Sequence, residues 1–377
     1  MTRVASVCLV FALVATARAQ APSALLGSLP AAGPATADSA HQLYSALRGD
    51  WDVSVVDYQE SGARHTGTGE WHFDWVLEGR AMQDVWISPP RGEQRPAVTA
   101  PAFDRYGTTV RYFDPAIDAW RLTWVNPAQN YVATLVGRAR GNDIVQEGVD
   151  DDGRTLRWTF SGITSAAFFW RGEVSLDSGR TWRTVQEMTA RRAPARTAGS
   201  GPSANLMDAL LAGGPAAENA GALRLFGQFV GSWDCTLSVP NPDGTLATGA
   251  GEIHAGWVLE GRAVQDVWIY PRRGMPAEGG HEYGTTIRFF DRKAGNWRSI
   301  WISPVNHVTR SFRVHADGDE IFLAARTSHG LPQRWIFSAI TPRSFHWRNI
   351  VSPDDGSTWQ LLEDISARRI GAPPAGR

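Results

Sequence analysis

The stretch Trp-Val-Leu-Glu-Gly-Arg-Ala at residues 75–81 returns unchanged at residues 257–263, 182 positions later (257 − 75). A second phrase, Tyr-Gly-Thr-Thr, stands at residues 106–109 and again at 283–286, where the offset has fallen to 177 (283 − 106). Eight tryptophans of the first half have partners in the second half at one of these two offsets. The chain therefore carries one domain twice. The length difference falls between the two phrases, in Pro- and Gly-rich sequence that we expect to be a loop.

The first residues have the features of a secretory signal. Arg3 precedes an apolar run over residues 4–15 and the small-residue triplet Ala-Arg-Ala at 17–19, which predicts a signal peptide over residues 1–19. We therefore expect an exported protein, periplasmic or secreted. No later run approaches the roughly 20 apolar residues of a membrane-spanning helix, so no integral membrane segment is expected.

Two blocks of ordinary domain size are separated by segments rich in Ala, Pro and Gly. The expected order is a flexible N-terminal segment at 20–40, a first domain at 41–192, a linker at 193–221, a second domain at 222–369 and a C-terminal tail at 370–377. Once the signal is removed, Cys235 is the only cysteine, so no intramolecular disulfide can form and each domain depends on its core. The formal net charge is −1 with no basic block, which argues against a nucleic-acid partner.

Each block is a succession of short apolar and aromatic runs separated by Gly, Asp-Gly, Pro and Asn, a pattern typical of antiparallel strands. In the first block these runs cover residues 51–58, 69–76, 80–88, 108–114, 120–125, 156–163, 168–175 and 181–190. A short helix-compatible segment opens each block, at residues 40–47 and 222–229. Eight or more strands without long helices predict an all-β domain, either a closed barrel or a sandwich.

The repeated phrase predicts a hairpin and its register. If Glu78 and Gly79 form a two-residue loop, the paired residues are Trp75 with Met82, Phe73 with Asp84 and Trp71 with Trp86. One face then holds Trp71, Phe73, Trp75, Leu77, Arg80, Met82, Asp84 and Trp86, and the other holds Glu70, His72, Asp74, Gln83 and Val85. In the second copy the aromatic face keeps Trp257, Leu259, Arg262, Asp266 and Trp268. A carboxylate among indole rings must find a partner.

The nearest candidate cation for that carboxylate is Arg111, on the next expected strand, and the second copy repeats the pair as Asp266 and Arg288. One interpretation is a buried structural ion pair. The other is that the arginine, with Tyr106 in the first copy or Tyr283 in the second, points into a barrel and holds an anionic or polar ligand head with its planar fork of donors.

Gly49-Asp50-Trp51 and Gly231-Ser232-Trp233 resemble the Gly-x-Trp that opens the first strand of lipocalins and related calycin barrels. That resemblance implies that an arginine of the last strand, Arg192 or Arg369, packs across the first-strand Trp51 or Trp233 by cation–π stacking. The fuller pattern of repeated phrases is similar to a bacterial lipocalin-like family whose members are mostly uncharacterised. It implies two consecutive antiparallel calycin-like β-barrels, each preceded by a short helix, and brings no established catalytic residues.

These observations favour an exported, non-enzymatic protein that binds a small apolar or amphipathic ligand, with no cofactor and no metal. The expected ligand-binding residues are Asp84, Trp86, Tyr106, Arg111 and Trp124 in the first copy and Asp266, Trp268, Tyr283, Arg288 and Trp301 in the second. The unequal loops at residues 89–105 and 271–282 are expected to rim the two entrances. The sequence leaves the oligomeric state open.

Two other functions compete with ligand binding. Glu70 with His72, repeated as Glu252 with His254, places a carboxylate and an imidazole on one strand face, and together with Asp84 they could support a hydrolase or isomerase. Barrels packed solid with tryptophan would instead indicate a structural or interaction module.

The phrase Ser-x-Asp-x-Gly-x-Thr-Trp, at residues 175–182 and 352–359, matches the Asp box of sialidases. It occurs once per copy and not at the spacing of propeller blades. We therefore interpret it as a hairpin turn in which the Asp caps backbone N–H groups.

Overall fold

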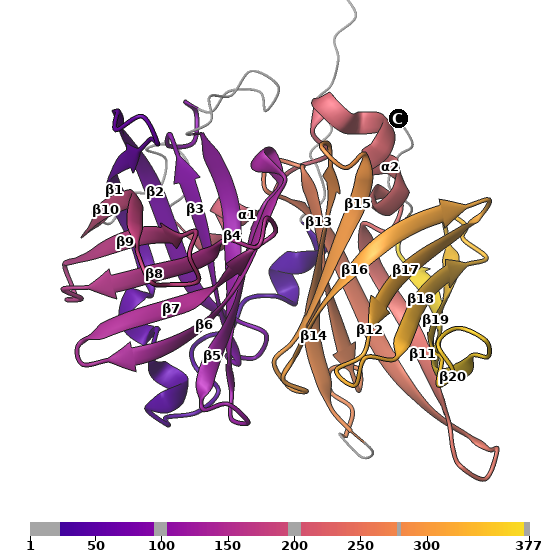
Figure 1. The fold of residues 1–377 in the computed structure, drawn as a ribbon. Helices are drawn as coiled ribbons and strands as arrows, with labels where there is room; N and C mark the ends of the chain where they lie inside the picture. Colours follow the sequence, from indigo (N-terminus) through magenta and orange to yellow (C-terminus); the bar gives the residue numbers. More distant parts are fainter. Residues whose placement is uncertain (1–22, 94–103, 195–204, 277–279, 373–377) are drawn as a thin grey trace, which may run out of the picture.

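The computed structural model describes residues 23–93, 104–194, 205–276 and 280–372. Within these ranges the chain forms two closed antiparallel β-barrels, one from each half of the sequence, which lie side by side (Figure 1). The predicted all-β fold with two barrels in tandem is confirmed. The expected signal peptide at residues 1–19 lies outside the described residues, as do parts of the linker, the tail and both entrance loops.

Each barrel is a meander of ten strands in which every strand pairs with the next. The first barrel comprises β1 (Gly49–Tyr58), β2 (Arg64–Val76), β3 (Ala81–Ser88), β4 (Arg105–Asp114), β5 (Ala119–Asn126), β6 (Tyr131–Arg140), β7 (Asp143–Asp150), β8 (Thr155–Ser161), β9 (Ala167–Ser175) and β10 (Arg183–Arg192). The second comprises β11 (Gly231–Pro240), β12 (Leu246–Val258), β13 (Ala263–Tyr270), β14 (Glu282–Asp291), β15 (Asn296–Ser303), β16 (Val308–Asp317), β17 (Glu320–Arg326), β18 (Pro332–Ser338), β19 (Ser344–Val351) and β20 (Gln360–Ile370). The last strand of each barrel pairs with its first strand and closes the sheet.

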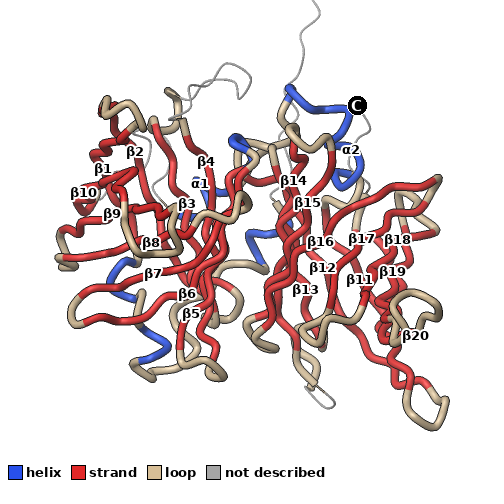
Figure 2. The backbone as a smooth tube through the Cα atoms, viewed as in Figure 1, coloured by secondary structure: helices blue, strands red, loops and turns tan. Residues whose placement is uncertain are grey.

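The helices are short and lie outside the sheets (Figure 2). They are the 3₁₀ turns η1 (Ala24–Gly27), η2 (Ala40–Gln42), η3 (Ser45–Leu47), η4 (Pro127–Gln129) and η5 (Ala217–Asn219), and the α-helices α1 (Leu206–Leu210) and α2 (Ala220–Gly227). Thus the helical segment expected at residues 40–47 forms two 3₁₀ turns, and the one expected at 222–229 is α2. None of the described helices has the length and apolar character needed to cross a membrane.

One end of each barrel is closed by these helical segments and by a stacked arginine. The Arg192 guanidinium lies 3.7 Å from the centroid of the Trp51 ring, and its Nη1 donates to the carbonyl of Arg48 (2.6 Å). Arg369 lies in the same way over Trp233, at 4.0 Å. This is the contact that the lipocalin resemblance implies, and it joins the first strand to the last.

The β2–β3 hairpin has the predicted register, and every pair expected between residues 71–75 and 82–86 is present. Its turn is longer than predicted, because residues 77–80 lie outside both strands and the first three of them adopt positive φ (53°, 57° and 76°). Leu77 therefore packs between the barrels, and Arg80 lies half exposed near Glu78. The prediction that Leu77 and Arg80 belong to the inner face is wrong.

The second copy differs from the prediction in the same way. Leu259 packs between the barrels, and Arg262 pairs with Glu218 (Nε–Oε1 2.8 Å) instead of facing the barrel interior. The turn also leaves no space for a side chain at its glycine, since a Cβ on Gly261 would lie 2.1 Å from the carbonyl oxygen of Gly214. The turn and the segment that precedes the barrel therefore pack directly against each other.

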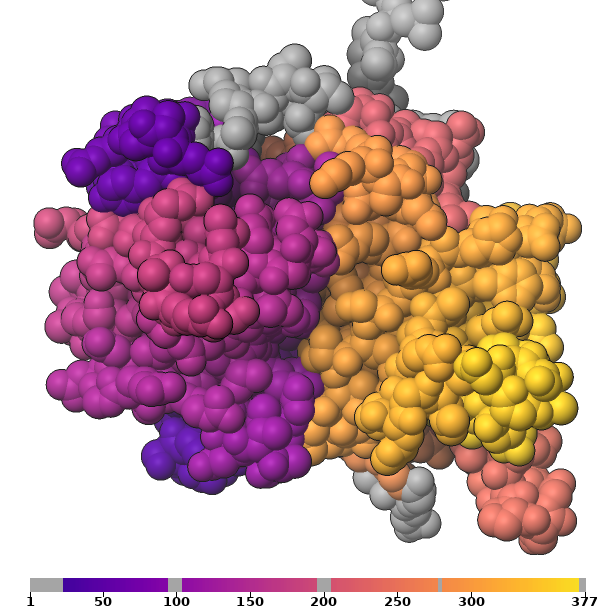
Figure 3. Space-filling model, in the orientation of Figure 1, coloured from indigo at the N-terminus to yellow at the C-terminus, as the bar shows by residue number. Residues whose placement is uncertain are grey.

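An apolar cluster lies between the two barrels, in addition to the core inside each of them. Near it, the equivalent residues Gln83 and Gln265 are fully buried and exchange amide hydrogen bonds, with Nε2–Oε1 distances of 3.1 and 3.2 Å. A reciprocal contact between equivalent residues indicates an approximate two-fold axis between the barrels. Figure 3 shows the two halves sharing a continuous boundary on the visible face.

The segments that precede the barrels cross over this boundary. We name residues 23–31 the first arm and residues 205–212 the second arm. Helix α1 of the second arm packs on β2 and β3 of the first barrel, whereas η1 of the first arm packs on β12 of the second barrel. Each arm therefore covers the barrel of the other half.

After crossing, each arm returns to its own barrel. The Leu77 N–H donates to the Leu29 carbonyl (2.9 Å), and the Leu259 N–H donates to the Leu210 carbonyl (2.8 Å). The sequence interpretation treated these segments as flexible or linking, and the structure corrects it for their described residues. Backbone hydrogen bonding and burial of leucines hold both arms in place.

Candidate functional site

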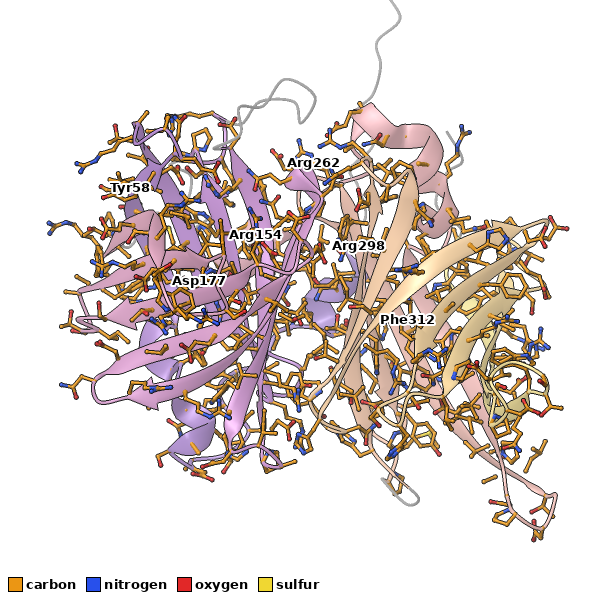
Figure 4. The ribbon with its side chains drawn as sticks, viewed as in Figure 1. Tyr58, Arg154, Asp177, Arg262, Arg298 and Phe312 are labelled. Carbon is orange, nitrogen blue, oxygen red and sulfur yellow. The ribbon has the colours of Figure 1, made fainter. Side chains whose placement is uncertain are left out.

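The first barrel encloses a cavity of about 420 Å³ at the end away from η2 and η3. Its wall consists of Trp71, Trp86, Trp124, Trp158, Trp170, Tyr131, Arg105, Arg111, Arg154, Arg183, Asp150, Asn126, Gln129, Gln186, Thr109, Leu156, Val174, Val185 and Met188. A volume of this size falls within the range of roughly 300–1,000 Å³ that is common for small-molecule sites. Figure 4 shows Arg154 on this barrel.

Three inward-facing glycines keep the cavity open. The pairs are Gly69 with Trp86, Gly107 with Trp124 and Gly172 with Trp170, and a Cβ on each glycine would lie 2.5, 2.6 and 2.6 Å from the indole ring. Because the glycine has no side chain, the ring can lie against the barrel wall instead of extending across the interior.

Two of the lining tryptophans have an indole N–H without an acceptor. Trp71 and Trp86 are only 4% and 3% exposed, and their Nε1 atoms have no hydrogen-bond partner among the described residues. At the closed end, by contrast, the Nε1 atoms of Trp51 and Trp120 each donate to a backbone carbonyl at 2.8 Å. Buried N–H groups normally have a partner. Trp71 and Trp86 therefore hold, within the cavity wall, two buried donors that the described residues leave unsatisfied.

The four arginines of the cavity wall are each paired with a carboxylate. The pairs are Arg111 with Asp84, Arg105 with Asp57 (2.9 Å), Arg154 with Asp150 (2.7 Å) and Arg183 with Glu60 (3.3 Å). The aspartate side chains are at most 4% exposed, so they hold the guanidinium groups in fixed positions.

The predicted Asp84–Arg111 pair is the most deeply buried of these. Arg111 Nη1 contacts Asp84 Oδ2, and the guanidinium lies over the rings of Tyr44 and Phe73, 5.3 and 5.6 Å from their centroids. Asp84 Oδ1 also accepts hydrogen bonds from the N–H and the hydroxyl of Thr109, both at 3.3 Å. Arg111 is thus part of a buried ion pair and of the cavity wall at the same time, so the two interpretations of the sequence are not exclusive.

The predicted residues do not all meet at the cavity. Trp86, Arg111 and Trp124 line it, and Asp84 lies behind Arg111. Tyr106 points the other way, toward the second barrel.

The hydroxyl of Tyr106 donates to the Ala209 carbonyl of the second arm (2.6 Å), and its counterpart Tyr283 donates to the Ser28 carbonyl of the first arm (2.6 Å). The expectation that these tyrosines contact a ligand is wrong. Tyr106 is five positions from Arg111 on one strand, and an odd spacing places two side chains on opposite faces of a sheet.

In the second barrel, Asp266 and Arg288 form the equivalent ion pair, with the guanidinium 5.1 Å from the centroid of Phe226. Trp268 and Trp301 lie over glycines, as their counterparts do in the first barrel. The predicted residues of the second copy, apart from Tyr283, therefore occupy positions equivalent to those around the first cavity.

The sequence interpretation missed several cavity residues, among them Arg105, Arg154, Trp158 and Trp170. The two tryptophans were visible as members of repeated pairs. They were missed because the strands on either side of residues 131–150 could not be placed around the barrel without knowing that this region forms a hairpin.

The outer wall of the first barrel carries the predicted Glu70–His72 contact. His72 Nε2 lies 3.1 Å from Glu70 Oε2, and His72 Nδ1 lies 2.7 Å from Asp50 Oδ1. Arg91 donates to Glu70 from Nε (2.7 Å) and Nη2 (3.1 Å). Burial alone would raise the pKa of Glu70, but the hydrogen bonds from His72 and Arg91 outweigh it and hold that pKa well below its ordinary value.

The equivalent histidines differ in their titration. Burial opposes protonation of both, but contacts with Asp50 and Glu70 raise the pKa of His72 above its ordinary value. His254 has Ser232 in place of an aspartate (Oγ–Nδ1 2.9 Å), and there burial prevails over Glu252 and lowers the pKa. The absence of the aspartate and the nearby charges of Arg273 and Arg272 both favour the neutral form of His254.

This outer cluster cannot act together with Asp84. In β2 and β3, Glu70 and His72 lie on the outer face and Asp84 lies on the inner face, so the barrel wall separates them. The alternative of a hydrolase or isomerase that uses these three residues together lacks the required geometry. Among the described residues, no group of three His, Cys, Asp or Glu side chains is placed to hold a metal ion.

The Asp-box phrase forms the predicted turn between β9 and β10. Asp177 Oδ1 accepts from the backbone N–H groups of Arg180 (3.1 Å) and Thr181 (2.9 Å), and Trp182 Nε1 donates to the Gly179 carbonyl (3.0 Å). Hydrogen bonds from Thr181 lower the pKa of Asp177 to about 2. The motif stabilises a hairpin of a barrel, and the described strands form no propeller blades.

No protein-family model and no curated protein matches this chain. Among solved structures, an S-type phycobiliprotein lyase, CPES, from Guillardia theta is similar over 40% of this chain and 93% of its own, with 14% identity and a TM-score of 0.30. A protein of unknown function from the DUF3598 family, from Nostoc punctiforme, aligns over 87% of this chain and 98% of its own, with 8% identity and a TM-score of 0.22. A double mutant of transferrin binding protein B from Haemophilus parasuis aligns over 85% and 76%, with 9% identity and a TM-score of 0.18. Similarity this low carries no conclusion about a ligand.

Proposed function

We propose that the first barrel binds a small amphipathic organic anion. Its apolar body packs against the tryptophans, and its acidic group lies near the indole N–H groups of Trp71 and Trp86 and the guanidinium of Arg111. The observation that supports this most directly is the cavity of about 420 Å³, whose wall combines five indole rings with two buried N–H donors that have no acceptor.

The apolar part of the ligand follows from the rings of the cavity wall. Each 100 Å² or so of apolar surface that a ligand removes from water contributes roughly 2.5 kcal/mol. Aromatic rings gain a further contribution from offset or edge contacts with indole. A ligand with a flat or aromatic body therefore uses this wall best.

The acidic group of the proposed ligand is inferred from the arginine side chains in the cavity wall. Arg111 belongs to the cavity wall, whereas its partner Asp84 does not. A guanidinium has five N–H donors, and one carboxylate does not use them all. Arg111 thus offers donors and positive charge to an acidic group, with Asp84 as its orienting partner.

The test uses anilinonaphthalene sulfonate, a fluorescent aromatic anion, and the full chain. Gly172→Asn gives the first barrel the residue of the second copy at this position and displaces the Trp170 ring, since even a Cβ there would lie 2.6 Å from it. We expect at least a roughly tenfold loss of dye affinity, equivalent to about 1.4 kcal/mol. Gly67→Ala is the matched control, because its Cβ meets no atom closer than 3.5 Å.

A second variant tests the polar contact. Trp71→Phe keeps a ring in the wall and removes one N–H. It should therefore lower the affinity for the anionic dye more than the affinity for a neutral naphthalene of similar shape. Equal binding of the dye by the wild-type chain and by Gly172→Asn would show that the cavity is not the site.

We also propose that the chain is exported, on the basis of its first 19 residues. Expression with its own N-terminus in a Gram-negative host, followed by fractionation and intact-mass measurement, checks this. A mature protein beginning at Gln20 is expected, and a cytoplasmic chain that keeps residues 1–19 would overturn the proposal.

A further inference from the structure

The open end of the second barrel carries charges that the first barrel lacks. At the offset of 177 (282 − 105), Glu282 replaces Arg105, Glu363 replaces Gln186 and Arg310 replaces Ala133. The counterparts Arg105 and Gln186 line the first cavity. The second barrel therefore has a different charge pattern at the same place.

These side chains point into the barrel. Successive residues of a strand face opposite sides, so in β16 Arg310 shares the face of Phe312, a core residue that is labelled in Figure 4. In β20, Glu363 shares the face of the core residue Ile365. In β14, Glu282 lies two residues before Gly284, on which the Trp301 ring rests.

None of the three charges is neutralised within the described part of the chain. No ion pair joins Glu282, Arg310 or Glu363 to another described residue, whereas each arginine of the first cavity has a carboxylate partner. Glu282 Oε1 accepts from the Ser303 hydroxyl (2.6 Å), and Glu363 Oε2 accepts from Asn349 Nδ2 (2.7 Å). Neutral donors hold the two carboxylates without cancelling their charge.

Partial burial makes these charges unfavourable. Burial raises the pKa of Glu282, hydrogen bonds from Ser303 and Asn306 oppose this, and the nearby Glu363 raises the pKa further. Burial lowers the pKa of Arg310, against the opposing effect of Glu363. Both directions indicate charged forms that have lost water without gaining a full partner.

Two deeply buried polar atoms beside this cluster are also unsatisfied. Gln333 is 3% exposed, and its Nε2 donates to Asn349 Oδ1 (2.7 Å), but its Oε1 has no partner in the described part of the chain. Trp335, on the same inward face of β18, is 8% exposed, and no described residue accepts from its indole N–H. The described residues thus leave one acceptor and one donor unsatisfied inside the barrel.

Solvent reaches this interior. Trp268 and Trp347 are partly exposed, although they face inward, whereas their counterparts Trp86 and Trp170 are 3% and 7% exposed. An inward-facing side chain of a closed barrel can meet water only through an open end. A small molecule can therefore approach from the same side.

We infer that the open end of the second barrel binds a small zwitterion, an amino acid with an apolar side chain. Its ammonium group is bound by Glu282 and Glu363, and its carboxylate by Arg310. An ammonium group has three donors and no acceptor, so Gln333 Oε1 supplies a further acceptor, and the indole N–H of Trp335 is available to the ligand carboxylate. This site is separate from the first-barrel cavity and does not depend on the function proposed for it.

Three probes with the same phenyl body separate the two sites. L-Phenylalanine has both charges, phenylethylamine has only the ammonium, and phenylpropionate has only the carboxylate. Isothermal titration of the full chain carrying Gly172→Asn, in which the first-barrel cavity is blocked, is expected to show that L-phenylalanine binds roughly tenfold or more tightly than phenylethylamine and phenylpropionate, because each of these lacks one of the two charge-assisted contacts.

Two variants place first-barrel residues in the second barrel. Glu363→Gln and Arg310→Ala introduce the residues found at positions 186 and 133, which this fold already accommodates. Each variant should lower the affinity for L-phenylalanine about tenfold or more. Each should leave the affinity for anilinonaphthalene sulfonate unchanged. Gly172→Asn should lower the affinity for anilinonaphthalene sulfonate and leave the affinity for L-phenylalanine unchanged. Failure of one proposal can therefore be distinguished from failure of the other.

The inference is overturned if L-phenylalanine does not bind, if it binds no better than both single-charge probes, or if Glu363→Gln and Arg310→Ala leave its affinity unchanged. Circular dichroism and thermal unfolding of both variants ensure that a loss of affinity reflects the site and not the fold.

Discussion

The two barrels share one fold and equivalent contacts at their boundary but have different interiors at the open end. Gln83 and Gln265 make the same contact at their boundary, and Tyr106 and Tyr283 each bind the arm of the other half. At the open end, by contrast, paired arginines in the first barrel give way in the second to charges that have no ion-pair partner among the described residues. The repeated phrases of the sequence thus describe how the halves pack together, and the two proposed ligand sites include positions where the copies differ.

The largest effect is expected from breaking the buried ion pair of the first barrel. Asp84→Ala leaves the Arg111 guanidinium, whose side chain is 1% exposed, without its carboxylate, and should lower the free energy of unfolding by about 3–5 kcal/mol. Asp266→Ala should lower the free energy of unfolding by less, because the side chains of Asp266 and Arg288 are 12% and 7% exposed. Urea denaturation followed by tryptophan fluorescence measures both.

A double variant controls for the loss of the carboxylate itself. Asp84→Leu with Arg111→Met removes both charges and should recover most of the stability that Asp84→Ala loses. Equal losses for Asp84→Ala and Asp266→Ala would contradict the difference in burial between the barrels.

The next effect concerns the boundary that the two halves share. Gln83→Ala removes both reciprocal hydrogen bonds and leaves the fully buried Gln265 amide short of partners, so a loss of about 1–3 kcal/mol is expected. Gln265→Ala should give the same loss because of the two-fold relation. The double variant should lose less than the sum, since neither amide then remains unpaired; strict additivity would argue against the reciprocal contact.

The smallest effect concerns the two outer histidines. Exchanging the first-strand residues, by Asp50→Ser and Ser232→Asp, should lower the pKa of His72 and raise that of His254, and NMR titration of the imidazole protons measures both. A shift of one unit corresponds to about 1.4 kcal/mol. If neither pKa moves, Asp50 is not the cause of the difference.

The two histidines should also make stability depend on pH in opposite directions. The pKa of His72 is raised, so its contribution is fully present below the ordinary value of 6.5 and is lost as the pH rises through the raised pKa. The pKa of His254 is lowered, so its contribution is present above 6.5 and is lost as the pH falls through the lowered pKa.

Alternation of residue types was enough to predict the fold and the register of the β2–β3 hairpin. Strands β6 and β7 were not predicted, because the first repeated tryptophan after Trp124 is Trp158, and because Arg138 and Arg140 interrupt the apolar pattern near a Gly-Asn turn at 141–142. The odd spacing between Tyr106 and Arg111 places the two side chains on opposite faces of the sheet. The prediction that both contact a ligand gave more weight to their proximity in sequence than to this spacing.

The arms illustrate what sequence patterns alone do not contain. Leucines 25, 29, 206 and 210 indicate burial, but a short apolar segment does not identify the surface that it covers. The cavity could not be predicted from the sequence either. Whether an indole ring fills a barrel or lies against its wall depends on the strand pairing and on which neighbouring residue is a glycine, as at Gly172.

The crossing of the arms imposes an order on biosynthesis. Once translation has passed Arg192, the first barrel has all its strands, but the leucines that cover its outer face, in the second arm, have not yet left the ribosome. The first arm, in turn, is made at the very start and has no second barrel to cover until the last strand is complete. The nascent chain therefore holds two apolar surfaces without their partners for the time needed to translate its second half.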